Sequence, residues 1–96
     1  MRRREKSIEK SCKDWAIKHG FWVKKFKSPG RRAAPDDIFA HSGVIVFCEF
    51  KAQGEVPTPL QEDYHKEMRT HGLEVFWTDS VEYFKRIMQA KYPWAF

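Results

Sequence analysis

The chain has 96 residues and a mass of 11.5 kDa, which accommodates a single domain. Hydrophobic residues make up 42% and charged residues 32% of the sequence, a balance typical of globular proteins. No apolar run approaches the roughly 18 residues that a membrane span requires. Two cysteines, Cys12 and Cys48, are too few for a disulfide framework or a zinc knuckle. We therefore expect a reduced, intracellular protein of the cytoplasm, and disfavour secretion, membrane insertion and a zinc-finger scaffold.

Positive charge is concentrated in the first third of the chain. Residues 1–32 hold twelve Lys/Arg and three Asp/Glu (net +9), whereas residues 33–96 hold six and ten (net −4), which together give +5. A basic surface suits a phosphate backbone, because neutralised phosphates release counterions. The residues that we expect to contact DNA are Lys24, Lys25, Lys27, Arg31 and Arg32. The alternative is a solvated basic face without a partner.

The first half of the chain predicts a helix, a strand and a hairpin. Apolar residues recur at helical spacing from Ile8 to Ala16, and Gly20 is a natural end for that helix. Residues 21–23 then favour a strand, and the Pro-Gly pair within 28–32 favours a loop.

The hairpin comprises strands over residues 37–40 and 44–51, joined by a tight turn at 41–43. The second of these strands has the strongest β signal in the chain. A loop over residues 54–57 follows it.

A second helix is predicted to begin after Thr58. Thr58 fits the N-cap, Pro59 the first helical position and Gln61 the third, a spacing that predicts a capping box. Gly72 closes this helix. Its predicted apolar stripe comprises Leu60, Tyr64 and Met68.

Residues 73–78 favour a strand, and Asp79 with Glu82 fits the N-cap and third position of a last helix. The predicted order is α-β-β-β-α-β-α, a mixed α/β domain. Residues 1–6 form a basic arm and residues 91–96 an aromatic tail. Exposed aromatic side chains could offer an apolar dimer face: Trp22, Trp77, Tyr92, Trp94 and Phe96. The alternative for them is the domain core, which we favour for Trp77 but not for the tail, where Trp94 and Phe96 would cover either the core or a partner subunit.

Acidic and basic residues gather where the predicted hairpin begins and ends. Side chains alternate between the faces of a strand, so Glu49 and Lys51 share one face and Cys48 takes the other. A carboxylate beside an ammonium can hold a divalent cation and a polarised water. Asp36 and Asp37 precede the hairpin, and acids there would repel a phosphate unless a cation bridged them. The alternative is that Glu49 and Lys51 are solvated surface charges.

The Pro35-Asp36 pair, followed after a hairpin by Glu49-Phe50-Lys51, resembles the PD-(D/E)XK nuclease superfamily and, more narrowly, its VRR-NUC group. That group has a helix bearing Glu, a Pro-Asp strand, a Glu-x-Lys strand and a following helix bearing Gln. The corresponding positions here are Glu9, Asp36, Glu49, Lys51 and Gln61. The resemblance spans roughly residues 5–90, with one departure at Ala33, where the family commonly has Gly.

The resemblance implies a restriction-endonuclease-like fold, a mixed β-sheet flanked by helices, for a single domain over residues 1–96. It implies that Mg²⁺ or Mn²⁺ is held by Asp36, Glu49 and the carbonyl of Phe50, with Glu9 contributing directly or through water. Lys51 would be the catalytic lysine, and Gln61 would lie close to the active site.

Several of these positions have a purely structural alternative. Alternation alone does not choose between Asp36 and Asp37; the motif selects Asp36, and we expect Asp37 to be a solvated or loop-capping acid. Glu9 could instead pair with Lys13, four residues along the helix. Gln61 could serve only its helix cap. Histidine spacing predicts no metal site, and His65 is expected on the helix surface.

The predicted function is metal-dependent hydrolysis of phosphodiester bonds in DNA. Resemblance to stand-alone VRR-NUC members implies a homodimer that acts on branched DNA such as four-way (Holliday) junctions, in a phage or bacterial setting. The alternatives are a structure-blind endonuclease or nickase, and a noncatalytic DNA-binding module.

Overall fold

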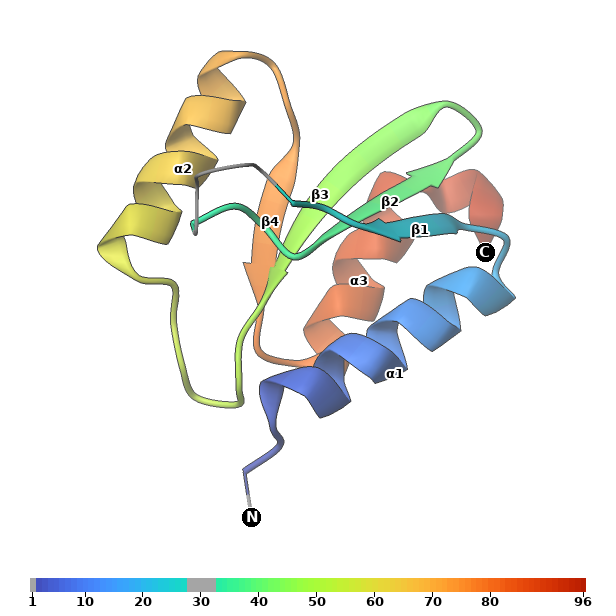
Figure 1. The fold of residues 1–96 in the computed structure, drawn as a ribbon. Helices are drawn as coiled ribbons and strands as arrows, with labels where there is room; N and C mark the ends of the chain where they lie inside the picture. Colours follow the sequence, from blue (N-terminus) through green and yellow to red (C-terminus); the bar gives the residue numbers. More distant parts are fainter. Residues whose placement is uncertain (1, 28–32) are drawn as a thin grey trace.

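A computed structural model describes residues 2–27 and 33–96, so the predicted DNA contacts Arg31 and Arg32 lie outside the described residues. The order of helices and strands is the predicted one, followed by a short 3₁₀ helix (Figure 1). The elements are α1 (Glu5–Lys18), β1 (Trp22–Lys25), β2 (Asp37–His41), β3 (Val44–Phe50), α2 (Pro59–Thr70), β4 (Val75–Thr78), α3 (Val81–Lys91) and η1 (Pro93–Ala95).

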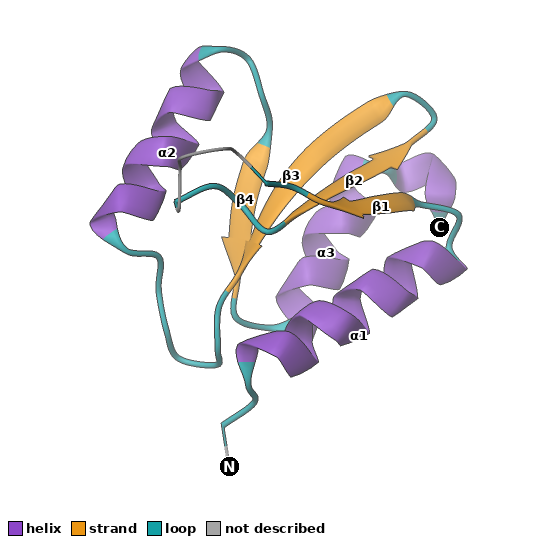
Figure 2. Ribbon diagram, in the orientation of Figure 1, coloured by secondary structure: helices purple, strands orange, loops and turns teal. Residues whose placement is uncertain are grey.

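The four strands form one mixed sheet in the order β1-β2-β3-β4 (Figure 2). The first three strands are antiparallel, and β4 runs parallel to β3. The register places Asp37 opposite Cys48, and Glu49 beside Trp77 of β4. The expected α/β fold with a mixed sheet flanked by helices is therefore confirmed.

Helices cover the two faces of the sheet unequally. α1 and α3 pack together on one face, called here the inner face, and α2 packs beside β4 on the opposite, outer face (Figure 1). The inner face of β3 consists of Val46, Cys48 and Phe50, all fully buried. The rest of this core comprises Ile8, Cys12, Ala16, Phe21, Phe39, Phe84, Met88 and Tyr92. The outer face of β1, β2 and β3 is therefore the less covered face of the sheet, and it carries the candidate site.

Turns and caps fix the ends of these elements. Ser42 (φ 52°) and Gly43 (φ 81°) both adopt positive φ, as a two-residue hairpin turn of the primed type requires. The predicted capping box of α2 is present: Thr58 Oγ1 accepts from the Gln61 N–H at 3.2 Å, and Gln61 Oε1 accepts from the Thr58 N–H at 2.9 Å. The two reciprocal bonds fix the start of α2.

The predicted N-cap of α3 was wrong by one residue. Ser80 caps α3 by accepting a hydrogen bond from the Tyr83 N–H at 3.1 Å. Asp79 instead accepts one from the Gly54 N–H at 2.9 Å. Its carboxylate is thus used to hold the loop after β3, a tertiary contact that local spacing does not reveal.

The predicted apolar stripe of α2 was also wrong at Leu60, which is 72% exposed. The buried residues of α2 are His65 and Met68. With Gln61 they form an i, i+4, i+7 series, and Leu60 stands about 100° of helix rotation away from it. The first two residues of this series are polar, and both face Glu49 of β3.

Residues 91–96 do not form a free tail. Tyr92, expected to be exposed, is fully buried, and its hydroxyl donates to the Val44 carbonyl at 3.0 Å. Phe96 stacks on Trp15 with ring centroids 4.8 Å apart. Trp94 is exposed as expected. Among the described helices, none has the length and apolar character needed to traverse a bilayer.

Candidate active site

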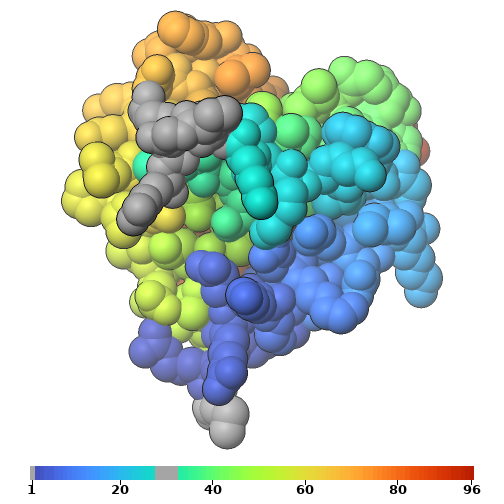
Figure 3. All heavy atoms as spheres, viewed as in Figure 1, coloured from blue at the N-terminus to red at the C-terminus, as the bar shows by residue number. Residues whose placement is uncertain are grey.

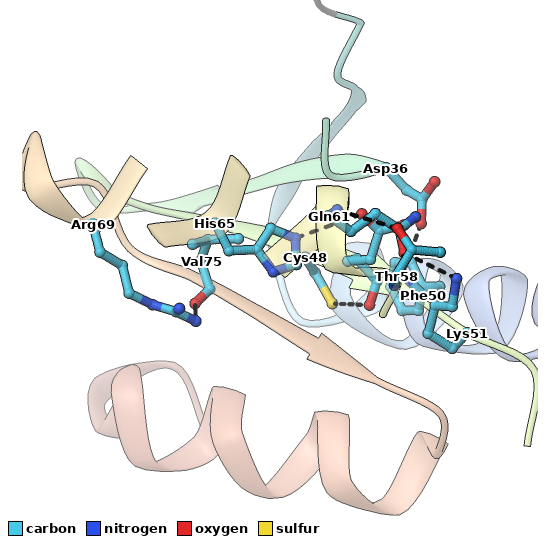
Figure 4. Close-up of polar contacts among 10 residues, drawn as sticks. Asp36, Cys48, Phe50, Lys51, Thr58, Gln61, His65, Arg69 and Val75 are labelled. Atoms are coloured by element: carbon cyan, nitrogen blue, oxygen red, sulfur yellow. Dashed lines mark hydrogen bonds and ion pairs between the residues drawn. The ribbon is translucent and has the colours of Figure 1, made fainter. Parts of the chain in front are cut away.

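The three residues expected to form the site meet at the end of β3. Glu49 projects from the outer face, and Asp36, the residue just before β2, lies close enough for the two carboxylates to interact. The Asp36 N–H donates at 3.1 Å to the carbonyl of Cys48, which the register pairs with Asp37, so Asp36 departs from the regular ladder. Lys51 follows Glu49 by two residues and returns to the same face. Figure 4 shows this end of the sheet beneath α2.

Asp36 is anchored to the residue between Glu49 and Lys51. Its Oδ2 accepts a hydrogen bond of 2.7 Å from the Phe50 N–H. Burial raises the pKa of Asp36 to about 7; the Phe50 hydrogen bond opposes this, and the nearby carboxylate of Glu49 adds to it. A positive charge bound beside Asp36 and Glu49 would therefore favour the ionised form of Asp36.

Gln61 links the cation and the anion of β3. Its Oε1 accepts from Lys51 Nζ at 3.1 Å, and its Nε2 donates to Glu49 Oε2 at 3.2 Å (Figure 4). The same Oε1 accepts from the Thr58 N–H in the capping box. Gln61 therefore closes the helix cap and also contacts Glu49 and Lys51, because the capping geometry directs its amide toward β3.

His65 also faces Glu49, and its expected place on the helix surface was wrong. It is buried, with Nε2 3.6 Å from Glu49 Oε1, too far for a hydrogen bond. Neither of these buried atoms has a hydrogen-bond partner. Its spacing of four from Gln61 places His65 on the same face of α2 as that residue.

The two acids of α1 point to different places. Glu9 Oε2 pairs with Lys25 Nζ at 2.8 Å rather than with Lys13. Burial acts to raise the pKa of Glu9, but its interactions with the Asp37 carboxyl and the Lys25 ammonium outweigh it and the pKa is lowered. Glu5 instead lies near the β3 site: burial raises its pKa, Lys51 opposes this, and Glu49 adds to it. The sequence interpretation missed Glu5.

Asp37 is not the solvated acid that was expected. It is fully buried on the inner face, since it shares the register and side of Cys48. Lys13 Nζ lies 3.4 Å from its Oδ1. Burial, followed by the contact with Glu9, raises the pKa of Asp37 to about 7. Asp37 therefore belongs to a structural cluster beneath α1.

Comparison with known proteins identifies the family. No family model matches the chain. A protein of Acyrthosiphon pisum secondary endosymbiont phage 1, named "Putative nuclease p44", is 45% identical over 80 residues, which cover 82% of this chain and 86% of that protein. A solved structure described as a VRR_NUC domain matches with a TM-score of 0.83 and 29% identity, covering 91% of this chain and 96% of the other. The chain belongs to the VRR-NUC nuclease family.

The donor set of this VRR-NUC domain suits a hard cation held jointly with substrate. Among residues 2–27 and 33–96, no three His, Cys, Asp or Glu side chains are placed to hold a metal ion by themselves. Magnesium is commonly bound by one or two carboxylates, with phosphate and water completing its shell. The buried, unpartnered Oε1 of Glu49 and the raised pKa of Asp36 fit such a site.

The predicted DNA-contact lysines of the VRR-NUC domain are divided between the faces. Lys24 lies on the outer face with the site, and Lys27 is exposed. Lys25 is directed to the inner side and pairs with Glu9. In the space-filling view, the residues that follow β3 are visible at the surface between α1 and α2 (Figure 3).

The basic arm of the VRR-NUC domain is attached beside the site. Arg2 Nε donates to the Gln53 carbonyl at 2.7 Å, and the Arg3 N–H donates to Gln53 Oε1 at 3.0 Å. The Gln53 N–H in turn donates to the Arg3 carbonyl at 3.0 Å. These bonds hold the start of α1, including Glu5, against the loop that follows Lys51.

Proposed function

We propose that this VRR-NUC domain is a metal-dependent endonuclease that hydrolyses phosphodiester bonds in DNA. The observation that supports it most is the convergence of Asp36, Glu49 and Lys51 on one face at the end of β3. A protein that only bound DNA would gain nothing from buried acids next to a phosphate. The nuclease name of the phage relative agrees with this proposal.

Asp36, Glu49 and the carbonyl of Phe50 would hold Mg²⁺ or Mn²⁺, with an α1 acid contributing directly or through water. Bound there, the cation supplies Lewis acidity and a water of lowered pKa. Of the two α1 acids, Glu5 acts electrostatically on Glu49 and Lys51 as well as on Asp36, whereas Glu9 acts on Asp36 but is also paired with Lys25. We propose Glu5 for this role in place of Glu9.

Lys51 contributes a positive charge whose position is fixed by a hydrogen bond to Gln61. Its ammonium has three donors, one of which is used on Gln61 Oε1. The remaining N–H groups would orient the attacking water or stabilise negative charge on the phosphate oxygens. Gln61 holds Lys51 and Glu49 in one arrangement, so it is a positioning residue in this mechanism.

The substrate that we propose is branched DNA, in particular the four-way (Holliday) junction, cut by a homodimer. A junction has two-fold symmetry, and two active sites related by a two-fold axis would make paired nicks. Exposed apolar side chains at the C-terminal end, Trp94 and Phe96, offer area for a second copy. The kinship with a phage protein supports action in the cytoplasm of a bacterial host.

The test of this proposal is a panel of labelled substrates. Purified protein is incubated with a four-way junction, linear duplex and single strands in Mg²⁺, Mn²⁺ or EDTA. We expect junction-selective cuts that EDTA abolishes. Equal cutting of linear duplex would indicate a structure-blind endonuclease, and binding without cutting in every metal would indicate a noncatalytic module.

The homodimer is tested by size in solution. A mass of about twice 11.5 kDa at micromolar concentration supports it. A mass near 11.5 kDa for the free protein, together with a junction complex that contains a single protein copy, would contradict it.

A further inference from the structure

A row of apolar side chains crosses the outer face at the end remote from the candidate active site. Trp22 of β1 lies opposite Ala40 of β2, which lies opposite Ile45 of β3. Trp22 is 55% exposed and Ile45 is 51% exposed, a large apolar area for so small a domain. Val23, the neighbour of Trp22, packs against the inner core, so alternation directs Trp22 to the outer face.

This row is continuous with the carboxylates. The next row toward the site consists of Lys24, Ile38 and Phe47. Phe26 covers Phe47, with ring centroids 5.1 Å apart. The row after that contains Glu49, so the apolar row, the lysine and the site share one face of the sheet.

A positive charge lies beside the exposed indole. Lys24 Nζ is 5.8 Å from the centroid of the Trp22 ring. An aromatic ring beside a cation, on a path that leads to a phosphate-cutting centre, is the combination that binds single-stranded nucleic acid: the ring stacks on a base and the cation contacts the backbone.

We propose that Trp22 is a stacking platform for an unpaired base of the DNA substrate, with Lys24 on the adjacent phosphate. The inference rests on the proposed nuclease function and specifies its substrate. A base inside an intact duplex already stacks on its neighbours, so this platform selects DNA with unpaired bases.

Four residues along the strand separate the row of Trp22 from the row of Asp36, a distance of about 13 Å. That length corresponds to about four steps of a stacked strand.

A second copy of the chain is the other occupant that could cover this face. It would lie across the route to Asp36 and Glu49 and would bring two copies of Lys24 together. Positive charge and continuity with the site therefore favour DNA.

The test measures binding in EDTA, which requires no cleavage. Fluorescence anisotropy gives the affinity for a plain duplex and for a duplex whose single unpaired base is moved one to eight nucleotides from a fixed end. The variants are Trp22→Ala, Trp22→Phe and, as matched control, Tyr83→Ala, since Tyr83 is an aromatic residue of α3 that is 44% exposed. The melting temperature of each variant checks that it folds.

We expect Trp22→Ala to weaken binding of the unpaired-base substrates about tenfold or more, the loss that removal of one base–aromatic stack produces. Plain duplex affinity should change less than about twofold. Trp22→Phe should retain most of the affinity, and Tyr83→Ala all of it. Tryptophan fluorescence should be quenched by the unpaired-base substrate in the wild type and much less in Trp22→Phe.

Two outcomes would overturn the inference. One is a Trp22→Ala variant whose affinity for all substrates falls equally or not at all, with no quenching in the wild type. The other is a Trp22→Ala variant that becomes monomeric, which would assign this face to a second copy. If the wild type binds through Trp22 but cuts no DNA in Mg²⁺ or Mn²⁺, the proposed function fails and the stacking site stands.

Discussion

Gln61 Nε2 donates a 3.2 Å hydrogen bond to Glu49 Oε2, joining the start of α2 to the proposed metal-binding strand. The same amide closes the helix cap with Thr58, so one side chain has two separable functions. This separation leads to the first prediction.

Gln61→Glu should retain the cap and impair the site. Glutamate serves as well as glutamine in a capping box, but it replaces the donor to Glu49 with a second carboxylate. We expect cleavage to slow about tenfold or more, as for other residues that orient metal ligands. Thr58→Ala is the matched control: it should cost about 1 kcal/mol of stability and leave the cleavage rate of the folded protein nearly unchanged. If both variants lose activity equally, Gln61 acts only through the cap.

Glu5→Gln and Glu9→Gln should have different effects, although the two acids stand one helical turn apart. Glu5 has its electrostatic contacts with Glu49 and Lys51, so its loss should lower cleavage about tenfold and raise the Mg²⁺ concentration required. Glu9→Gln breaks the ion pair with Lys25 and should mainly lower the melting temperature. Mg²⁺ titrations of cleavage, with thermal melts alongside, separate the effects. A larger activity loss in Glu9→Gln would restore the assignment made from sequence.

Asp37 should make the metal-free protein less stable as the pH rises. Its pKa is about 7 in the folded state and close to its ordinary value, 3.8, when unfolded. Between these values the folded state holds a proton that the unfolded state has lost, so stability falls as pH rises from about 4 to 7. Asp37→Asn should remove this pH dependence. The difference in free energy of unfolding between variant and wild type should therefore shift in favour of the variant, by about 1 kcal/mol or more, between pH 4 and pH 8. Urea unfolding in EDTA at both pH values measures it. An identical pH dependence in the variant would show that Asp37 is ionised throughout.

Local spacing was sufficient to predict the part of the site that lies on one element or across one turn. The alternation of β3 placed Glu49 and Lys51 together, and the Thr58–Gln61 spacing predicted a capping box that the structure confirms. These relations depend only on backbone periodicity and on hydrogen bonds between residues close in sequence.

Contacts between different helices and strands could not be predicted from local spacing. Glu5 and Glu9 stand one turn apart on the same side of α1. The way in which α1 packs on the sheet brings Glu5 near Lys51 and Glu9 into an ion pair with Lys25. The burial of His65 against Glu49 likewise depends on how α2 docks. Hydrogen bonds from Arg2 and Arg3 to Gln53 join residues fifty positions apart.

Single-turnover cleavage of a labelled junction by Lys51→Ala, with saturating Mg²⁺, tests the catalytic centre most directly. The exposed Lys66 of α2 provides the control variant Lys66→Ala. We predict that Lys51→Ala binds the junction like the wild type and cuts it at least about 100-fold more slowly, the usual cost of removing one group that stabilises transition-state charge. Cleavage by Lys51→Ala within about threefold of the wild type would contradict the account.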